Sequence, residues 1–396
     1  MASTINTNIV SLNAQRNLSV SQSSLATSMQ RLSSGLRVNS AKDDAAGLAI
    51  SERMNTQVRG LTVASRNAND GISLAQTAEG ALSKVGDMLQ RMRELAVQSG
   101  NATNTADDRK ALQSEVSQLS DEIDRVAKTT TFNGTKIIDG SFSGAVFQVG
   151  ANSGDNITVG ALANSKASEL GSVNYGAASG SISSGATGYT KAIASGTISI
   201  QVDGGKKISI NTKIEAASSA SERVGQVIAA INSKTADTGV TAFLSDDGKS
   251  VQMRSSTLTS GGTAASVSLS GVTASEGFSV TTISAQASGN ATKGVDTVSV
   301  STQADAWVAL KKIDKAIDSV NSSRASLGAL QSRFENTVAN IDVQTENISA
   351  SRGRIVDADF AKETANLSRS QILQQAGTAM VAQANQLPQG VLSLLR

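Results

Sequence analysis

Residues 313–348 read IDKAIDSVNSSRASLGALQSRFENTVANIDVQTENI, and their apolar side chains recur at alternating spacings of four and three. The apolar positions are Ile313, Ile317, Val320, Leu327, Phe334, Val338, Ile341 and Ile348. This heptad spacing is typical of a helix that packs along a partner helix. The remaining positions of the stripe hold Arg324, Gln331 and Thr345, and polar residues there favour one register with the partner.

This helix is expected to begin at Thr302-Gln-Ala-Asp305, where the Thr hydroxyl and the Asp carboxylate can bind amides of the first turn. We expect it to continue to about Ser349, a length of roughly 70 Å at 1.5 Å per residue. A helix of that length cannot bury its apolar stripe alone, so partner helices must lie elsewhere in the chain.

The composition excludes several classes of function. The chain of 396 residues has no Cys and no His, so thiolate and imidazole metal sites and the usual catalytic triads are absent. The net charge of +2 and the interleaved charges argue against a nucleic-acid partner. No segment has the pattern of a secretory signal peptide or the length of a membrane span, and we expect no cofactor, no metal and no catalytic residues.

The N-terminal third predicts four further helices. The first has an apolar stripe with a phase slip near Asn17 and ends at Gly35. A second, short helix is capped by Asp43 or Asp44 and runs towards Gln57. A heptad pattern then spans 75–99, and a capping motif at Thr105 opens another over 106–126. These last two helices should fold back antiparallel and close a bundle with the long C-terminal helix.

The middle of the chain reads as an insertion. Turn signals at 133–140 and an alternating stretch at 145–149 predict a β-hairpin. Residues 150–300 are rich in Gly, Ser, Thr and Ala, and within them 197–253 predicts a ββαββ unit. Residues 160–195 and 256–290 are expected to form loops and edge strands.

We therefore expect an α+β fold in which both chain ends build a long coiled-coil helical bundle around an inserted, mainly-β outer domain. The expected divisions are terminal coiled-coil helices at 1–40 and 357–396, a helical bundle with a β-hairpin at 41–150 and 300–356, and the variable outer domain at 151–299. A break at Arg352–Arg354, a restart at Asp357 or Asp359, and a kink at Pro388 are expected in the C-terminal part.

Both ends carry apolar stripes that form a predicted self-assembly seam. Its residues are Ile5, Ile9, Leu12, Leu25, Met29, Leu32, Leu373, Met380, Leu387, Val391 and Leu394. A membrane-surface role would require Lys or Arg with aromatic anchors, whereas Ser, Asn and Gln occupy the polar face. Two hypotheses remain: the two ends pair only with each other, or they pair and also pack against neighbouring subunits. The second fits better, because a pair of helices leaves its outer faces apolar.

The two ends resemble bacterial flagellin. The similarity lies in Ser11-Leu-Asn-Ala-Gln-Arg-Asn17, in Gln30 to Ile50, in Arg66 to Gln76, in Gln90 to Gln98 and in Gln383 to Arg396. It covers roughly residues 1–150 and 300–396, and 197–253 is similar to a repeat inserted in many flagellins.

The resemblance implies a structural subunit that self-assembles into the flagellar filament for swimming motility. It implies export in an unfolded state through the flagellar type III channel, and hence a secreted, extracellular protein. The implied partners are copies of itself, an export chaperone, the filament cap and junction proteins. A hook-filament junction protein and an adhesin-like surface filament are the alternatives.

The resemblance also implies recognition by host immune receptors. Gln90, Arg91, Leu95 and Glu115 match flagellin positions read by an animal Toll-like receptor, and Gln30 to Ser51 matches a segment read by a plant receptor kinase. Because Arg91 and Leu95 lie four residues apart, they are expected to share one exposed stripe of the helix.

Overall fold

The computed structural model describes residues 7–182, 188–202, 207–245, 248, 250–256, 267–270, 278–280, 284–285 and 294–393. The chain divides into two compact units. The first contains residues 1–69, 147–157 and 335–396, and the second contains 70–146 and 158–334. Each unit is built from segments that are far apart in the sequence, as an insertion between paired helical ends requires.

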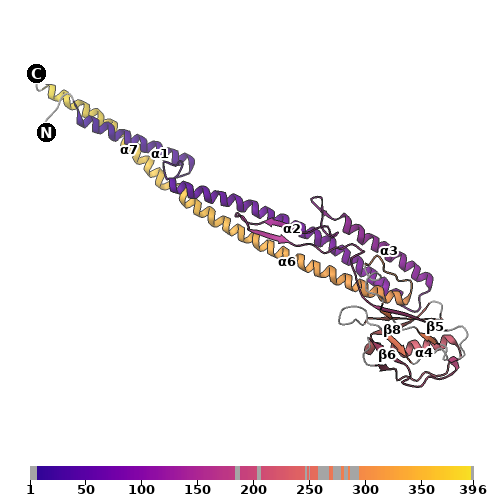
Figure 1. The fold of residues 1–396 in the computed structure, drawn as a ribbon. Helices are drawn as coiled ribbons and strands as arrows, with labels where there is room; N and C mark the ends of the chain where they lie inside the picture. The colour runs from indigo at the N-terminus through magenta and orange to yellow at the C-terminus, as the bar shows by residue number, and fades with distance from the viewer. Residues whose placement is uncertain are drawn as a thin grey trace. The chain divides into compact units, whose positions relative to one another are not determined.

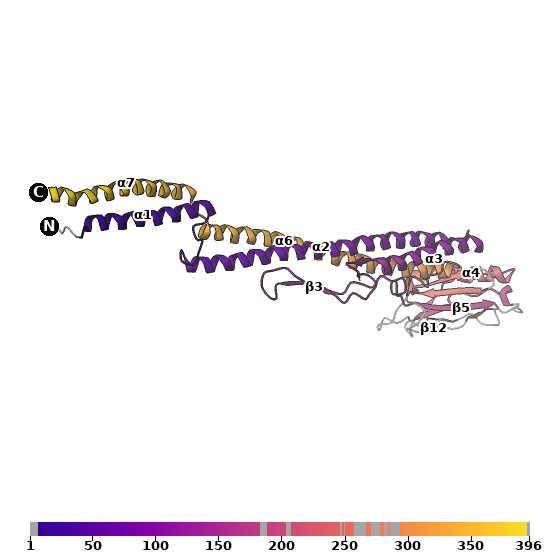
Figure 2. The ribbon, with the colours of Figure 1, turned by 90° about the horizontal axis from the view of Figure 1, so that it is seen from above.

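The first unit pairs the N-terminal helix α1 (Ile9–Ser34) with the C-terminal helix α7 (Phe360–Ser393), which lie side by side (Figures 1 and 2). Asn8 caps α1 by accepting a hydrogen bond from the Ser11 amide at 3.1 Å. Gly35 ends α1 in the left-handed conformation at φ 72°, as its position after the apolar pattern predicted. The expected kink at Pro388 does not interrupt α7, whose helical backbone extends to Ser393.

Two long helices, α2 (Ala45–Ser99) and α6 (Gln303–Val356), contribute residues to both units. The sequence prediction of a short helix to Gln57 followed by a separate helix was wrong, because α2 is continuous over 55 residues. No proline occurs in this stretch, and its glycines allow close packing. A Cβ at Gly60 would lie 2.9 Å from the Ala151 side chain, and one at Gly71 would lie 2.6 Å from the Phe334 ring.

The long helix α6 begins where its capping motif predicted, with the Asp305 amide bonded to the Thr302 hydroxyl at 3.1 Å. It ends later than expected, because it passes through Arg352–Arg354 and stops at Val356. A glycine flanked by arginines does not break a helix that is otherwise well hydrogen-bonded. The prediction that a new helix starts after Asp359 is confirmed, because the Asp359 carboxylate accepts hydrogen bonds from the Ala361 and Lys362 amides in the first turn of α7.

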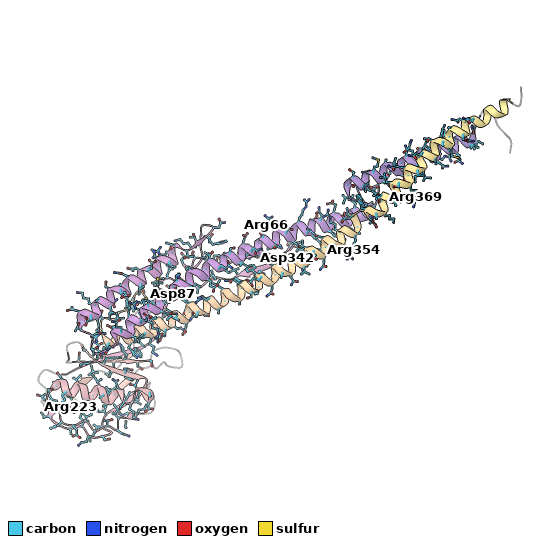
Figure 3. All side chains as sticks on the ribbon, turned by 180° about the vertical axis from the view of Figure 1, so that it is seen from behind. Arg66, Asp87, Arg223, Asp342, Arg354 and Arg369 are labelled. Atoms are coloured by element: carbon cyan, nitrogen blue, oxygen red, sulfur yellow. The ribbon has the colours of Figure 1, made fainter. Side chains whose placement is uncertain are left out.

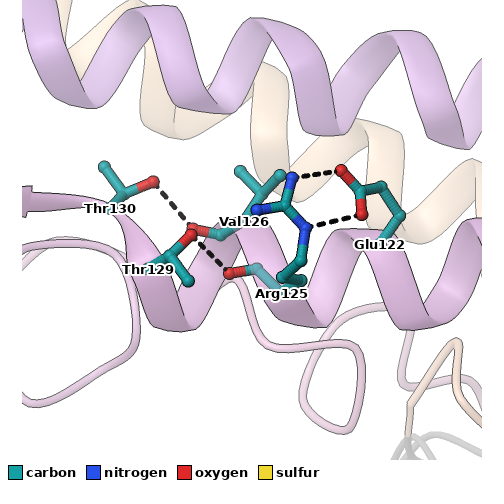
Figure 4. A network of polar contacts seen from close by, with 5 residues as sticks. All are labelled: Glu122, Arg125, Val126, Thr129 and Thr130. Atoms are coloured by element: carbon teal, nitrogen blue, oxygen red, sulfur yellow. Dashed lines mark hydrogen bonds and ion pairs between the residues drawn. The ribbon is translucent and has the colours of Figure 1, made fainter.

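The helix α3 (Ala106–Thr129) starts at a complete capping box between Thr105 and Asp108. Its last turn is closed by Thr129 and Thr130, whose hydroxyls donate to the carbonyls of Arg125 and Val126 at 2.8 and 2.7 Å (Figure 4). At its other end Arg109, which is 5% exposed, donates to the Ser99 carbonyl of α2 at 3.1 Å. Its guanidinium thereby binds carbonyls that the end of α2 leaves without helical partners.

The heptad positions of α6 in the second unit form the core with α2. Ile313, Val320, Leu327 and Phe334 are each at most 2% exposed. The polar positions also contact α2: Gln331 donates to Glu79 at 2.8 Å, and Arg324 lies 4.0 Å from the same carboxylate. One acid on α2 therefore contacts two of the polar positions that were expected to favour one register.

After α3 come two small antiparallel sheets. The first pairs β1 (Thr131–Phe132) with β2 (Thr135–Lys136) around Asn133-Gly134, and the second pairs β3 (Ala145–Gln148) with β4 (Asn156–Val159). The predicted turn chemistry is confirmed at Asn133, whose φ of 48° is positive.

The inserted region contains two antiparallel sheets and α4 (Ala220–Asn232), followed by α5 (Thr235–Thr238). One sheet has the order β10-β6-β7 and the other β11-β5-β9-β8, with β12 also paired to β5. The strands are β5 (Gly176–Ile182), β6 (Ser199–Val202), β7 (Ile208–Ser209), β8 (Val240–Leu244), β9 (Ser250–Ser255), β10 (Val267–Ser270), β11 (Phe278–Val280) and β12 (Ser284–Ala285), with a 3-10 turn η1 (Gly188–Thr190).

The predicted ββαββ order is present as β6, β7, α4, β8 and β9. The expectation that 160–195 forms only loops and edge strands was wrong, because β5 lies inside its sheet. Its Gly and Ser residues give no alternating apolar pattern, which is why the strand was missed. The core between the sheets and α4 includes Val224, Val227 and Ile231, each fully buried. Buried Arg223 (Figure 3) donates to the Tyr189 carbonyl at 2.5 Å.

The chain enters and leaves the inserted region side by side. The Val295 amide donates to the Ala167 carbonyl at 2.7 Å, and the Lys312 ammonium of α6 donates to the neighbouring Gly294 carbonyl at 3.4 Å. Lys312 is 2% exposed, and its ammonium donates to the Thr297 hydroxyl at 2.6 Å. Burial lowers the pKa of Lys312, and nearby Asp296 partly opposes that effect.

Candidate assembly surface

The contact between α1 and α7 buries small and polar side chains rather than large aliphatic ones. The most buried residues of the two helices are Ser11, Ser28, Glu363, Ser370 and Ala384, each at most 7% exposed. These residues remove little apolar area from water, so the pair gains little hydrophobic stabilisation from its own contact.

Polar and close-packed contacts hold the pair in register. Asn8 donates to the Ala384 carbonyl at 2.7 Å, and the Ser11 hydroxyl donates to Asn385 at 2.7 Å. The Leu18 side chain packs so closely that a Cβ at Gly377 would lie 3.2 Å from it. The pair therefore has a defined geometry despite its small apolar contact.

Most of the large aliphatic side chains of these helices point to the outside. Ile9, Val10, Leu12, Val20, Met29, Ile372, Leu373 and Met380 are between 51% and 68% exposed. Between the helices runs an apolar groove of about 410 Å³, lined by some of these residues and by Leu18, Ala376 and Gly377. Figure 3 shows side chains projecting from both helices, with Arg369 labelled on α7. Exposed aliphatic residues at this density are typical of an interaction surface.

The predicted seam residues divide between two faces. Ile9, Leu12, Met29, Leu373 and Met380 are exposed, whereas Leu25 and Leu32 are half-buried towards the partner helix. The phase slip near Asn17 is where the apolar stripe of α1 changes face, although the helix itself is continuous. For Leu387 and Val391 only the helical backbone is described, and Ile5 and Leu394 lie outside the described residues.

Sequence reasoning missed most of the residues that join α1 to α7. The inward face of α1 repeats at threes and fours through Asn8, Ser11, Ala14, Leu18, Ser21, Leu25 and Ser28. The spacing was visible in the sequence, but most of its members are small or polar, so a search for apolar residues passed over it.

The candidate receptor residues lie in the second unit. Arg91 binds Glu115 of α3 at 2.8 Å and Glu94 at 3.0 Å, and these carboxylates raise the pKa of Arg91. Gln90 is exposed. The expectation that Leu95 shares this exposed stripe was wrong, because Leu95 is 1% exposed. With α3 and α6 both packed against it, α2 buries a wider face than a two-helix seam would.

Neither a metal-binding cluster nor a membrane span occurs in the part of the chain that the structure describes. It contains no group of three or more carboxylates that could hold a metal ion. None of its helices is long and apolar enough to cross a membrane.

Three family models match the chain: the bacterial flagellin N-terminal helical region at residues 5–143, the bacterial flagellin C-terminal helical region at 310–395, and the flagellin hook IN motif at 197–257. Flagellin B of Vibrio cholerae serotype O1 is 41% identical over 397 residues, covering 100% of both chains. The B-type flagellin of Pseudomonas aeruginosa is also 41% identical, over 489 residues and 100% of both chains. The structure of FliC from Burkholderia pseudomallei matches 66% of this chain and 99% of its own, with 27% identity and a TM-score of 0.37.

Proposed function

The chain belongs to the bacterial flagellins, structural proteins of the flagellar filament rather than enzymes, and we propose that it assembles with copies of itself through the outer faces of α1 and α7. The sequence-based recognition of the family and of its fold class is confirmed. Self-assembly, export and the further partners are the parts of the function that we propose.

The observation that carries the proposal is the inverted burial of the terminal pair. Met380 is 61% exposed and Ile9 is 68% exposed, while Ser11 and Ser370 are buried between the helices. A pair of helices arranged in this way is destabilised in water by its exposed aliphatic side chains. Neighbouring subunits that cover those side chains would remove this cost. Each added subunit would bury those residues, so assembly and stabilisation of the pair would be one event.

Export in an unfolded state follows from the same weakness. Helices that bury little apolar surface are marginal on their own, so the ends would unfold easily for passage through a narrow type III channel. We propose that an export chaperone covers the apolar ends beforehand, and that a cap protein and junction proteins meet them at the ends of the filament. The assembled filament would be extracellular and would serve swimming motility.

A truncation tests the assembly proposal. Removing residues 381–396 should abolish filaments in electron micrographs of purified protein, while the thermal unfolding of the second unit stays unchanged. The double substitution Leu373→Ser and Met380→Ser, within α7, should have the same effect. Leu244→Ser is the matched control, because Leu244 is also exposed, at 45%, but lies in the inserted region. Normal filaments from the truncated chain would refute the proposal.

The same micrographs separate a filament subunit from a junction protein. A filament subunit forms long, uniform filaments without other proteins, whereas a junction protein is expected to form short assemblies only. An adhesin-like surface filament would add binding to host cells without changing the filament itself.

We further propose that host receptors recognise Gln90, Arg91, Glu115 and the buried Leu95 beneath them, and that a plant receptor kinase recognises Gln30 to Ser51. The exposed pair of Arg91 and Glu115 supports the animal site, because it joins two helices in one small patch. Arg91→Ala should lower stimulation of receptor-bearing cells by the unassembled chain. Arg125→Ala, which removes the equally exposed pair with Glu122 on α3, is the matched control. Equal potency of the two variants would show that the patch is wrong.

A further inference from the structure

The strand β8 lies at the end of its sheet, and among the described strands only β9 pairs with it. The Ser256 amide donates to the Gly239 carbonyl at 3.1 Å, which fixes the alternation of hydrogen bonds along the two strands. The backbone groups of Val240, Ala242 and Leu244 must therefore face away from β9. Such outward groups are a ready template for another strand.

Two side chains occupy the middle of this edge. Asn232, the last residue of α4, donates from Nδ2 to the Ala242 carbonyl at 2.9 Å and accepts from the Ala242 amide at 2.8 Å. The Thr238 hydroxyl accepts from the Val240 amide at 3.2 Å. One planar amide thus makes the two bonds that a residue of a neighbouring strand would make.

The residues of β8 itself contain none of the usual features that keep an edge strand from pairing with another strand. Val-Thr-Ala-Phe-Leu, residues 240–244, contains no charge and no proline, the usual means by which edge strands avoid pairing. An uncharged apolar strand can pair with an identical strand in antiparallel orientation, because the two are related by a twofold axis. The partner that this edge would accept is therefore a second copy of this chain.

We propose that Asn232, with help from Thr238, is an edge guard that keeps β8 from pairing with β8 of another copy. The role goes beyond filament formation, since it concerns a contact that must not form. In an assembly the inserted regions are held at high local concentration, where even a weak edge contact would join subunits or filaments wrongly. A simpler role, in which Asn232 only fastens α4 to the sheet, predicts loss of stability without association.

A thiol cross-linking reporter distinguishes the two roles. The chain has no native Cys, so Leu244→Cys places a single thiol at the exposed end of β8. In an antiparallel pair centred on Ala242 the two thiols lie about 13 Å apart, at about 3.3 Å per residue. Dimers of the full chain are trapped with a bis-maleimide of that span and measured on denaturing gels, with sedimentation velocity and thermal unfolding on the same samples. Asn232→Ala in this background should raise the dimer fraction about tenfold, which corresponds to about 1.4 kcal/mol of association free energy.

Two more variants in the same background complete the test. Thr238→Val leaves both Asn232 bonds in place. It frees the Val240 amide, removes the hydroxyl's bond to the Lys234 carbonyl at 2.8 Å, and should raise the dimer fraction about threefold, a smaller gain in association free energy. Asn232→Asp keeps the acceptor for the Ala242 amide and adds a charge, so it should stay at the level of Leu244→Cys alone. An unchanged dimer fraction in folded Asn232→Ala overturns the proposal. If Asn232→Ala unfolds the domain, an unchanged Thr238→Val overturns it. These results do not depend on filament formation, which is scored separately by microscopy.

Discussion

The terminal pair of helices and the bundle in the second unit both follow heptad spacing, but they bury opposite kinds of side chain. In the bundle, Leu82, Leu89, Met92 and Phe334 are at most 2% exposed. In the terminal pair, Leu12, Leu373 and Met380 are at least 51% exposed while serines are buried. The bundle is stabilised by its own core, whereas the terminal pair leaves most of its large aliphatic side chains in water. Spacing predicts which face of a helix packs, whereas residue size on that face indicates whether the chain alone suffices.

The largest expected effect comes from removing an aromatic ring in each region. Phe334→Ala should cost about 3–5 kcal/mol of unfolding free energy, because its fully buried ring packs against Gly71 of α2. Phe360→Ala removes the same atoms at a position that is 66% exposed on α7, and should cost less than about 0.5 kcal/mol. Urea unfolding of the unassembled chain measures both. Similar losses would mean that the terminal pair is as self-sufficient as the bundle.

A smaller effect is expected at the polar register contact of the bundle. Glu79→Ala removes the acceptor of Gln331 and the charge beside Arg324, and should cost about 1 kcal/mol because the group is partly exposed. Glu122→Ala, whose pair with Arg125 lies within one helix, is the control and should cost at most about 0.5 kcal/mol. Equal losses from the two variants would show that Glu79 does not help to set the register.

The buried Lys312 gives a pH-dependent prediction. Because its folded pKa is lowered below 10.5, the unfolded chain binds more protons between the folded and unfolded pKa values. The contribution of Lys312 to the unfolding free energy should therefore rise as pH increases through that window. The measurement is the unfolding free energy of the parent chain and of Lys312→Met from pH 8 to about 11, a range that spans the ordinary lysine pKa. As pH rises, the unfolding free energy of the parent should increase relative to that of Lys312→Met. A difference that is flat or falls with pH contradicts the assignment.

The smallest effect should follow deletion of the inserted region, which lies outside both helical regions compared above. Replacing residues 172–293 by a short glycine linker should leave assembly intact. The reason is that the Val295 amide already donates to the Ala167 carbonyl where the chain enters and leaves the inserted region. A deletion limited to 191–256 would leave β5 without β9, a defect that the sequence did not reveal. Filament length in electron micrographs is the measurement, and a soluble, folded deletion that cannot assemble would give the insertion a structural role.

The sequence predicted the fold where burial follows apolar spacing, as along α6 and at the caps of α1 and α3. It failed where packing depends on small residues, as for Ser11 and Gly377, or on a strand without an apolar pattern, as for β5. The prediction of a helix break between Gln57 and residue 75 was wrong for a related reason. At Gly60 and Gly71 the helix approaches Ala151 and Phe334 so closely that a side chain would obstruct the contact. These contacts are long-range, so local helix propensity does not reveal them. The receptor patch was misjudged at Leu95 because the number of helices packed around α2 is a tertiary property.

Hydrogen exchange before and after assembly tests the central claim most directly. In the unassembled chain, amides of α1 and α7 should exchange far faster than those of residues 303–334, because the terminal pair opens without exposing much buried apolar surface. In filaments the amides of α1 and α7 should slow by at least about a hundredfold, equivalent to about 2.7 kcal/mol of added protection, while those of 303–334 change little. Terminal helices that are equally protected in both states would contradict the claim that they gain their packing partners from neighbouring subunits.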